Sequence, residues 1–469
     1  MSVINFLGDA WCVRMDEGDP HEDALRIADA LGRLTRERFP ESTIVIGYDT
    51  RPLSLAIARE MGEVIAFYGI AARVSDAHCP ACVLTEEVRA DREAVAGVML
   101  TAGNKPADYF GIRICSADGS AATTEDTNLI ESYIVPELPV GRGEAKAVDL
   151  MTPYLERVFS LVEGNRIAES APIVVCDPMY GAQTSYACRA FSALGARVIE
   201  IHGDGAEDFA GVHPEAAEPW IDDCEQAVVD NGAAYGIAID GAGERIALVD
   251  ERGNYVSPHK TLALLMDYLV NCRNRSGRMI APIFVSSIVR RQAERLGLSL
   301  TVTPVGYAWM REEMAIGDTL CAGDAVGGIG IPEIGLDRDA LGAAVMLMDA
   351  IARDGRPLSA MASELDETLG HMEYGRRELS LGAGEAQMLR VALPGINPPS
   401  IAGLKVEGVS HPSHCLRLAL PEGAWVLVAP SPAGPTALLA AEAPTRAMRD
   451  ELLAAAAELA RSPLSRGDE

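Results

Sequence analysis

The most closely spaced cysteines in the sequence form the segment Cys79-Pro-Ala-Cys82, within a chain that has ten cysteines. A redox-active pair with this spacing opens a helix, where the pKa of the thiol is lowered. A zinc site needs a second pair at a suitable spacing, and the sequence has none. We therefore expect Cys79 and Cys82 to be reduced, structural thiols.

Loops that directly follow buried strands are the other places where chemistry is expected. The apolar runs Ala94–Met99 and Tyr235–Ile239 lead straight into the segments 101–106 and 240–245, and a third polar segment spans 323–328. Ligands of parallel α/β sheets bind at the carboxyl ends of the strands. These three loops are therefore the candidate sites.

Alternating strands and helices predict the sheets that carry these loops. Thr43–Tyr48 is a short apolar, β-branched run typical of a buried parallel strand, and Ser54–Ile70 has helical spacing. The pattern restarts near Pro172 and again near Lys260, which predicts three rounds of α/β structure. Beyond residue 370 the pattern predicts a smaller α+β domain. Further elements are expected at Pro282–Val285, Met388–Leu393, Ser413–Leu420 and Trp425–Ala429 (strands) and at Thr445–Leu459 (helix).

Short segments along nearly the whole chain carry a family resemblance. They are Phe6–Trp11, Gly47–Arg51, Gly97–Pro106, Tyr109–Arg113, Asp177–Gly181, Gly211–Glu215, Asp240–Arg245, Thr303–Tyr307, Gly323–Gly328 and Trp425–Ser431. In order and spacing they resemble the motifs FGTDGWR, GYDTR, GIMITASHNP, YNGIK, DPMHG, GVHPEP, DGDGDR, TPVGF, GEESGG and WVLVRPS of the α-D-phosphohexomutases, the family of phosphoglucomutases and phosphomannomutases.

The resemblance implies an α/β fold of three similar domains with mixed, mostly parallel sheets around a central cleft, plus a C-terminal α+β domain. The expected domains are 1–147, 148–256, 257–369 and 370–469. Each would donate one loop to the cleft. We call them the carrier loop (101–106), the metal loop (240–245), the sugar loop (323–328) and the phosphate loop (429–435).

The carrier loop lacks the nucleophile that the resemblance implies. The family moves a phosphoryl group through a serine that becomes phosphorylated, and Gly103 stands at that position. Asn104 stands where the family has a histidine, and an amide is no acid or base near neutral pH. Thr101 is the neighbouring hydroxyl that could substitute as carrier, although two residues of displacement would spoil an in-line geometry.

The metal loop is altered too. The family holds Mg²⁺ on three aspartates, and here the positions are Asp240, Ala242 and Glu244. The resemblance thus implies Mg²⁺ as cofactor, bound weakly or not at all, with a glycine-rich turn as the alternative reading. Lys105 stands where the family has asparagine, and we hypothesise that it pairs with Asp240 or Glu244. A solvated lysine is the alternative.

The sugar and phosphate loops keep few polar groups. Asp324 is flanked by Ala325 and Val326, and the phosphate loop keeps Ser431 but has lost its arginine, while Pro432 removes a backbone donor. Cations and a histidine remain elsewhere. Arg51, Arg245 and His213 stand at family positions as candidate substrate-binding or structural residues, with Arg14 near the expected cleft entry.

The net charge of −28 disfavours nucleic acid and anionic membranes as partners, and the sequence has no apolar run long enough to span a bilayer. Its N-terminus has no basic region followed by a long apolar core, so no signal peptide is expected. A cytoplasmic protein is expected.

The leading interpretation is a phosphohexomutase relative in carbohydrate metabolism whose site has eroded, with a binding or regulatory role. The alternatives are an active mutase, an intramolecular phosphotransferase with another carrier, and an interaction scaffold without a small ligand. Hexose phosphate, a second copy of the chain or an active mutase are the expected partners.

Overall fold

The computed structural model describes residues 4–162, 165–204, 208–382, 384–431 and 434–462. The chain forms two compact units. The first unit comprises residues 1–279 and 311–362, and the second comprises 280–310 and 363–469. Strand β12 (Arg278–Pro282) and helices α11 (Tyr307–Ile316) and α13 (Leu358–Leu369) contain the points where the chain passes between the units. Among the described residues, no helix combines the length and the apolar character needed to cross a bilayer.

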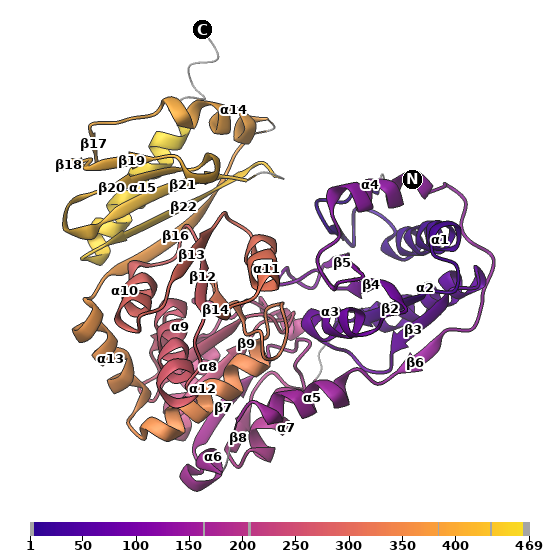
Figure 1. Cartoon of the computed structure of the whole chain (residues 1–469), viewed down its shortest axis with the longest axis horizontal. Coiled ribbons are helices and arrows are strands. Elements are labelled where there is room, and N and C mark those ends of the chain that lie inside the picture. Colours follow the sequence, from indigo (N-terminus) through magenta and orange to yellow (C-terminus); the bar gives the residue numbers. More distant parts are fainter. Residues whose placement is uncertain (1–3, 163–164, 205–207, 383, 432–433, 463–469) are drawn as a thin grey trace. The chain divides into compact units, whose positions relative to one another are not determined.

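The first unit opens with a mixed six-stranded sheet in the order β1-β5-β4-β2-β3-β6 (Figure 1). Strand β2 (Thr43–Tyr48) is buried along its whole length and pairs in parallel with both neighbours, as its apolar sequence predicts. The other elements of this part are β1 (Ala10–Arg14), α1 (Pro20–Arg38), α2 (Ser54–Phe67), β3 (Ala71–Ser75), α3 (Ala81–Ala90), β4 (Ala94–Leu100), β5 (Tyr109–Ser116), α4 (Thr124–Tyr133) and β6 (Lys146–Val148).

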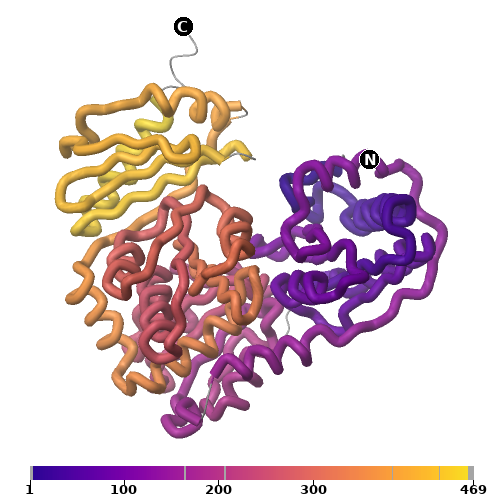
Figure 2. Tube along the Cα trace, in the orientation of Figure 1, coloured from indigo at the N-terminus to yellow at the C-terminus, as the bar shows by residue number. Residues whose placement is uncertain are grey.

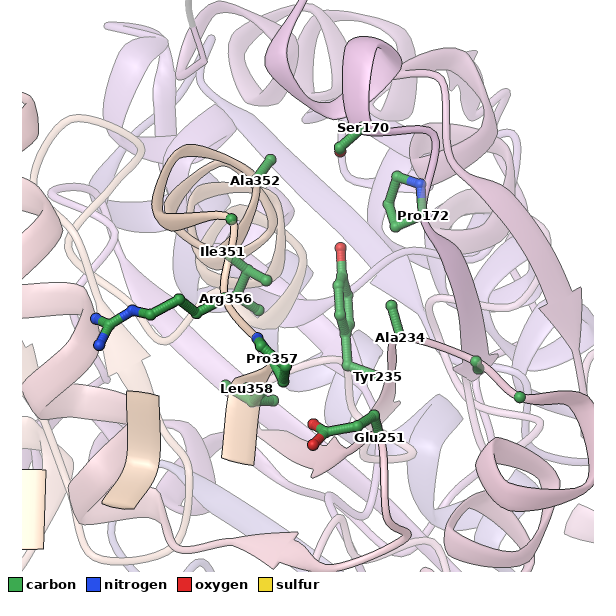
Figure 3. A pocket seen from close by; sticks show the side chains of 13 residues that line it. Ser170, Pro172, Ala234, Tyr235, Glu251, Ile351, Ala352, Arg356, Pro357 and Leu358 are labelled. Carbon is green, nitrogen blue, oxygen red and sulfur yellow. The ribbon is translucent and has the colours of Figure 1, made fainter. Parts of the chain in front are cut away.

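A second, five-stranded sheet follows in the order β11-β10-β9-β7-β8, with β7, β8 and β9 parallel. A cavity lies at the amino ends of β7 (Ile173–Asp177) and β9 (Tyr235–Ile239) (Figure 3). The metal loop follows the opposite, carboxyl end of β9. The elements are α5 (Met151–Ser160), α6 (Arg166–Ser170), β7 (Ile173–Asp177), α7 (Tyr186–Ala193), β8 (Arg197–Glu200), α8 (Asp222–Asn231), β9 (Tyr235–Ile239), β10 (Ile246–Asp250) and β11 (Tyr255–Val256).

The third α/β part contributes the sugar loop, which joins β14 (Thr319–Gly323) to its antiparallel partner β15 (Ile329–Gly330). The N-cap of its long helix α12, Asp339, accepts a hydrogen bond from the buried Tyr154 hydroxyl of α5 at 2.6 Å, which ties this helix to the preceding part of the chain. The remaining elements are α9 (Pro258–Asp267) with a π-helical turn (Tyr268–Cys272), α10 (Ser287–Arg295), β13 (Leu300–Thr303) and α12 (Ala340–Asp354).

The second unit contains an antiparallel sheet in the order β16-β22-β21-β20-β19, built from residues after 370 (orange to yellow in Figure 2). Helix α15 packs on it through Leu452, Ala456 and Ala460, all fully buried. The elements are β16 (Glu373–Ser380), α14 (Glu385–Ala392), β17 (Ser400–Ile401), β18 (Leu404–Lys405), β19 (Gly408–Ser410), β20 (Leu416–Ala419), β21 (Trp425–Pro430), β22 (Thr436–Ala443) and α15 (Arg446–Arg461).

The structure corrects three expected strands. Met388–Leu393 is largely helical, because Ala386, Leu389 and Leu393 recur at helical spacing on the buried side while Met388 and Val391 are exposed. The strand expected at Pro282–Val285 lies earlier, as β12 (Arg278–Pro282). The strand expected at Ser413–Leu420 begins only at Leu416, after a 3₁₀ turn.

Candidate active site

The carrier loop is held in place by Arg51, whose side chain is 1% exposed. Its guanidinium donates to the carboxylate of Asp49 at 3.2 Å and to four backbone carbonyls, those of Gly103 (2.9 Å), Lys105 (2.6 Å), Pro106 (2.7 Å) and Tyr109 (3.2 Å). These contacts use the donors of the guanidinium fork. Arg51 is therefore a structural residue that shapes this loop, rather than a free cation for substrate.

The carrier position itself has no functional group. Gly103 adopts a φ of +64°, and a Cβ built there would meet no atom within 4 Å. The adjacent hydroxyl of Thr101 accepts a hydrogen bond from the Gly103 N–H at 3.1 Å, and Thr101 is 4% exposed. The only side-chain hydroxyl that the carrier loop contains is thus buried and serves to shape the turn.

Asp240 lies at the carboxyl end of β9 and is fully buried. Its Oδ1 accepts from the backbone N–H groups of Glu244 (2.7 Å) and Arg245 (3.1 Å), and its Oδ2 faces the Arg245 guanidinium at 3.5 Å. Burial raises the pKa of this carboxyl to about 6, opposed by the Arg245 charge and reinforced by that of Glu244. Asp240 therefore organises the turn of the metal loop.

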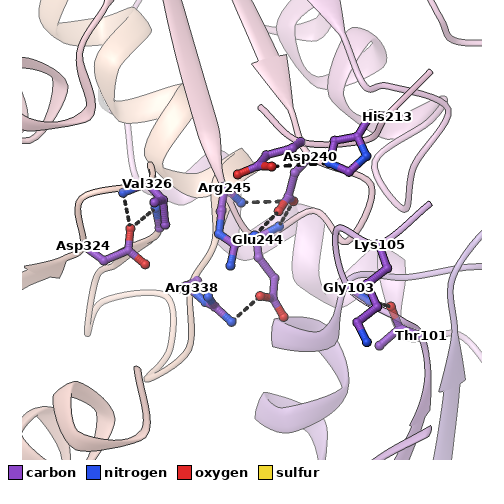
Figure 4. A network of polar contacts seen from close by, with 12 residues as sticks. Thr101, Gly103, Lys105, His213, Asp240, Glu244, Arg245, Asp324, Val326 and Arg338 are labelled. Atoms are coloured by element: carbon purple, nitrogen blue, oxygen red, sulfur yellow. Dashed lines mark hydrogen bonds and ion pairs between the residues drawn. The ribbon is translucent and has the colours of Figure 1, made fainter. Parts of the chain in front are cut away.

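Glu244 lies between two arginines that come from different parts of the first unit, and Figure 4 shows its pair with one of them, Arg338. Its Oε1 accepts from Arg113 of β5 at 2.8 Å, and its Oε2 pairs with Arg338, which precedes α12. Arg113 also binds Asp9 at 3.1 Å. Burial would raise the pKa of Glu244, but the charges of Arg338 and Arg113 outweigh it, so the pKa is lowered. We call Asp9, Arg113, Glu244 and Arg338 the arginine network.

The residues at the metal loop do not fit Mg²⁺. The ion needs several oxygen ligands in octahedral geometry, whereas the oxygens of Glu244 are bound to guanidinium groups and Oδ1 of Asp240 is bound to backbone donors. No cluster of three or more potential ligands was found among the residues that the structure describes. The positive charge that a metal would supply is provided here by arginine side chains.

The hypothesis that Lys105 pairs with Asp240 or Glu244 is wrong. The Lys105 ammonium lies 4.8 Å from the centre of the Tyr109 ring on its own loop, and both carboxylates have arginine partners. Arginine pairs with these carboxylates because its planar guanidinium matches a buried carboxylate, whereas a lysine ammonium keeps more of its hydration on an exposed loop.

The sugar loop is also held by internal bonds. Oδ1 of Asp324 accepts from the backbone N–H groups of Val326 and Gly328, each at 2.9 Å, and Asp324 is 7% exposed. Figure 4 shows Asp324 bound to the backbone of its own loop at Val326. Asp324 thus forms a turn, and the oxygen with these bonds is not available to read a sugar hydroxyl.

The other candidate residues lie in local contacts. The His213 ring packs at a tilt against Trp220, with ring centres 4.5 Å apart, and its Nε2 is 3.4 Å from Glu215. Arg14 forms exposed ion pairs with Asp16 (3.3 Å) and Asp108 (3.4 Å). Neither arrangement points to a substrate.

The phosphate loop belongs to the second unit. The Ser431 hydroxyl accepts from the Gly434 N–H at 3.1 Å, and the Ser431 carbonyl accepts from Arg390 at 2.6 Å. Pro432 lies outside the described residues. The described part of this loop is therefore a serine-stabilised turn.

The expected structural role of Cys79 and Cys82 is confirmed. Both are buried free thiols, Cys79 fully so. Burial raises the pKa of Cys79 to about 12 and raises that of Cys82 as well, which is the opposite of what a redox pair requires.

Sequence reasoning missed the arginine network as a unit. Asp9 and Arg113 stand inside the segments Phe6–Trp11 and Tyr109–Arg113 that carried the family resemblance. These two charged side chains at motif positions, together with the retained carboxylate Glu244, were the sequence signal that could have indicated a charged cluster. The convergence of Arg113 and Arg338 on Glu244 depends on β5, the metal loop and the segment before α12 meeting in space, which no local pattern reports.

Sequence profiles match three parts of the chain. The profiles described as phosphoglucomutase/phosphomannomutase α/β/α domains I, II and III match residues 13–137, 152–253 and 257–368. They span most of the three α/β parts, and the C-terminal α+β part follows them.

Curated relatives and solved structures agree with these matches. A phosphoglucosamine mutase from Rhodospirillum rubrum is 30% identical over 72% of this chain and 75% of its own length. A phosphoglucomutase/phosphomannomutase from Thermococcus kodakarensis is 26% identical over 76% of this chain and 80% of its own length. A provisionally assigned phosphomannomutase from Thermus thermophilus superposes with a TM-score of 0.85 and 25% identity, covering 98% of this chain and 100% of that one.

Proposed function

The chain belongs to the phosphoglucomutase/phosphomannomutase family, and from this premise we propose that it is a member without mutase activity that acts by binding. The observation that carries the proposal is the arginine network around Glu244. In this network arginine side chains bind the metal-loop carboxylate Glu244, at the position where the family's chemistry needs a bound metal ion.

Phosphoryl transfer through an enzyme intermediate needs a nucleophile that can carry the group. Gly103 offers none, and the buried Thr101 hydroxyl is engaged by the Gly103 N–H. The carrier loop is moreover fixed by four carbonyl contacts to Arg51. Moving the Thr101 hydroxyl into line with a substrate would break the turn that defines the loop.

The transferred group carries a charge of about −2, which the active site must neutralise as it forms. Arg113, Arg245 and Arg338 are cations in the right part of the first unit, but each already has a carboxylate partner, in Asp9, Asp240 or Glu244. The network holds together the segments that meet at Glu244, and its arginines are therefore not free to bind a transferred phosphate.

The preserved framework supports a binding role in carbohydrate metabolism, with hexose phosphate as the ligand class. The segments Asp177–Gly181 and Gly211–Glu215 stay close to the family's motifs, with Tyr180 in place of a histidine, although the reactive positions have changed. A second copy of the chain or an active mutase is the proposed protein partner.

The test is an activity and labelling experiment on the full chain. Purified protein would be given glucose 1-phosphate, mannose 1-phosphate and glucosamine 1-phosphate with Mg²⁺ and glucose 1,6-bisphosphate, and intact-mass spectrometry would look for a phosphorylated chain. We expect neither turnover nor phosphorylation. Turnover or a stable phosphoryl adduct on the unmodified chain would overturn the proposal, and its location would be sought first at Thr101.

Gly103→Ser is the informative companion variant. The position has room for a side chain, and the φ of +64° should cost only about 1 kcal/mol. We expect the variant to fold and remain inactive, because the metal loop is closed by the arginine network. Recovery of turnover by this single change would show that the network opens and that only the carrier was lost.

A binding measurement separates the ligand from the scaffold interpretation. Titration calorimetry with glucose 6-phosphate and glucose 1-phosphate should give saturable heat if hexose phosphate is the ligand class. Absence of binding up to millimolar concentrations would favour a scaffold without a small ligand. Light scattering of the chain, alone and mixed with an active mutase, would test both proposed protein partners.

A further inference from the structure

The cavity at the amino ends of β7 and β9 is separate from the loops described above, and its volume is about 430 Å³. Pro172 precedes β7, Tyr235 begins β9, and Glu251 follows β10. The opposite wall comes from Ile351 in the last turn of α12 and from Leu358 at the start of α13. The metal loop leaves the other end of β9, so the cavity cannot be part of the site already described.

The floor of the cavity contains an unsatisfied polar group. Tyr235 is 1% exposed, and none of the described residues offers its hydroxyl a hydrogen-bond partner. Figure 3 shows the phenol standing between Ile351 and the segment that contains Ser170 and Pro172. Burying a hydroxyl without a partner destabilises the folded chain, so a bound molecule that accepts a hydrogen bond from Tyr235 would remove this penalty.

The charged groups near the cavity already have partners. Glu251 accepts from the Ser359 hydroxyl at 2.5 Å and the Ser359 N–H at 3.2 Å. Arg356 forms a two-pronged pair with Asp354, at 2.7 and 2.8 Å. The walls therefore offer apolar surface from proline, alanine, isoleucine and leucine, and neither charge calls for an ionic ligand.

We propose that this cavity is a binding site for a small uncharged ring compound that carries one hydrogen-bond acceptor. The ring contacts Pro172, Ile351 and Leu358, and the acceptor accepts a hydrogen bond from the Tyr235 hydroxyl. Ligand sites in proteins commonly measure roughly 300–1,000 Å³ and combine apolar walls with few polar groups. The cavity falls in the lower part of this range, which suits a compound of one or two rings.

The test uses benzyl alcohol and toluene as probes, because they share a ring and differ by the hydroxyl. Binding to the full chain is measured by ligand-observed NMR titration up to about 5 mM. Three variants are compared: Tyr235→Phe removes only the hydroxyl, Ala352→Leu fills the cavity from its α12 wall, and Ala454→Leu places the same side chain on an exposed alanine of α15. Circular dichroism and thermal unfolding establish that each variant is folded.

We expect saturable binding of benzyl alcohol, weakened about fivefold by Tyr235→Phe, since one neutral hydrogen bond changes affinity by roughly 2- to 12-fold. Toluene binding should not weaken in this variant. Ala352→Leu should abolish binding of both probes, and Ala454→Leu should change neither. Unsaturable binding, or affinities that none of the cavity variants alters, would overturn the proposal.

Discussion

Replacing Glu244 by glutamine tests the arginine network directly. The side chain is 6% exposed and joins Arg113 to Arg338, whose side chains are 27% and 12% exposed. Removing one partner of a buried ion pair typically costs about 3–5 kcal/mol, because the remaining charges stay buried. Arg113 keeps Asp9 at 3.1 Å, so we expect the lower end of this range, about 3 kcal/mol.

The assay is urea unfolding followed by circular dichroism, with calorimetry alongside to resolve the transition of the first unit. A loss of about 3 kcal/mol should lower the Tm by on the order of 5 °C for a unit of this size. Asp354→Asn is the matched control, because it removes a carboxylate from a two-pronged pair with Arg356 whose side chains are 25% and 49% exposed. An exposed pair is worth at most about 1 kcal/mol.

A double-mutant cycle with Arg338→Gln isolates the pairwise interaction. The coupling between Glu244→Gln and Arg338→Gln should exceed about 1 kcal/mol, because the two groups share one buried contact. If Glu244→Gln cost no more than Asp354→Asn, or if the two changes at the network were additive, our account of the metal loop would be refuted.

Three further predictions concern the carrier and metal loops. Burial raises the pKa of Asp240 to about 6, from an unfolded value near 4, so its stabilising contribution is full below about pH 4 and falls by about 3 kcal/mol as the pH rises through 6. Asp240→Asn should flatten this part of the pH profile of urea midpoints. An unchanged slope would assign the pH dependence to another group. Arg51→Lys, which cannot form the four carbonyl contacts together, should lower the free energy of unfolding by about 2–3 kcal/mol and speed amide hydrogen exchange in the carrier loop. Lys105→Ala should lower it by less than about 1 kcal/mol, because the contact of Lys105 with the Tyr109 ring is exposed. Equal effects of the two variants would contradict the assigned roles. Exchanging 5 mM MgCl₂ for EDTA should leave the Tm of the wild-type chain unchanged. A Mg²⁺ site with a Kd near 50 μM would stabilise the folded chain by about 2.7 kcal/mol at this concentration, so a shift of several degrees would reveal a metal site.

Much of the fold could be predicted from local sequence. The strand at Thr43–Tyr48 is an apolar β-branched run buried on both faces, and Trp425–Pro430 is equally plain. The expectation of a strand at Met388–Leu393 is wrong because a short apolar run is compatible with either period, and only its packing against the second-unit core selects the helix.

The candidate site was predictable position by position, but not in its contacts. The sequence identifies Gly103 at the carrier position and Asp240 and Glu244 in the metal loop. It does not report that Arg51 uses its donors on backbone carbonyls. That assignment needs the path of the carrier loop, which is fixed by strands β4 and β5 on either side.

The sequence by itself determined the family, the order of the α/β rounds and the absence of a side chain at the carrier position, because motifs, periodicity and residue identity are local properties. The tertiary structure decided which cation faces Glu244. Arg113, Glu244 and Arg338 are far apart in the chain, and their buried charges compete through space. Lys105 was the nearer candidate by motif, but only folding shows that two guanidinium groups already satisfy the carboxylate.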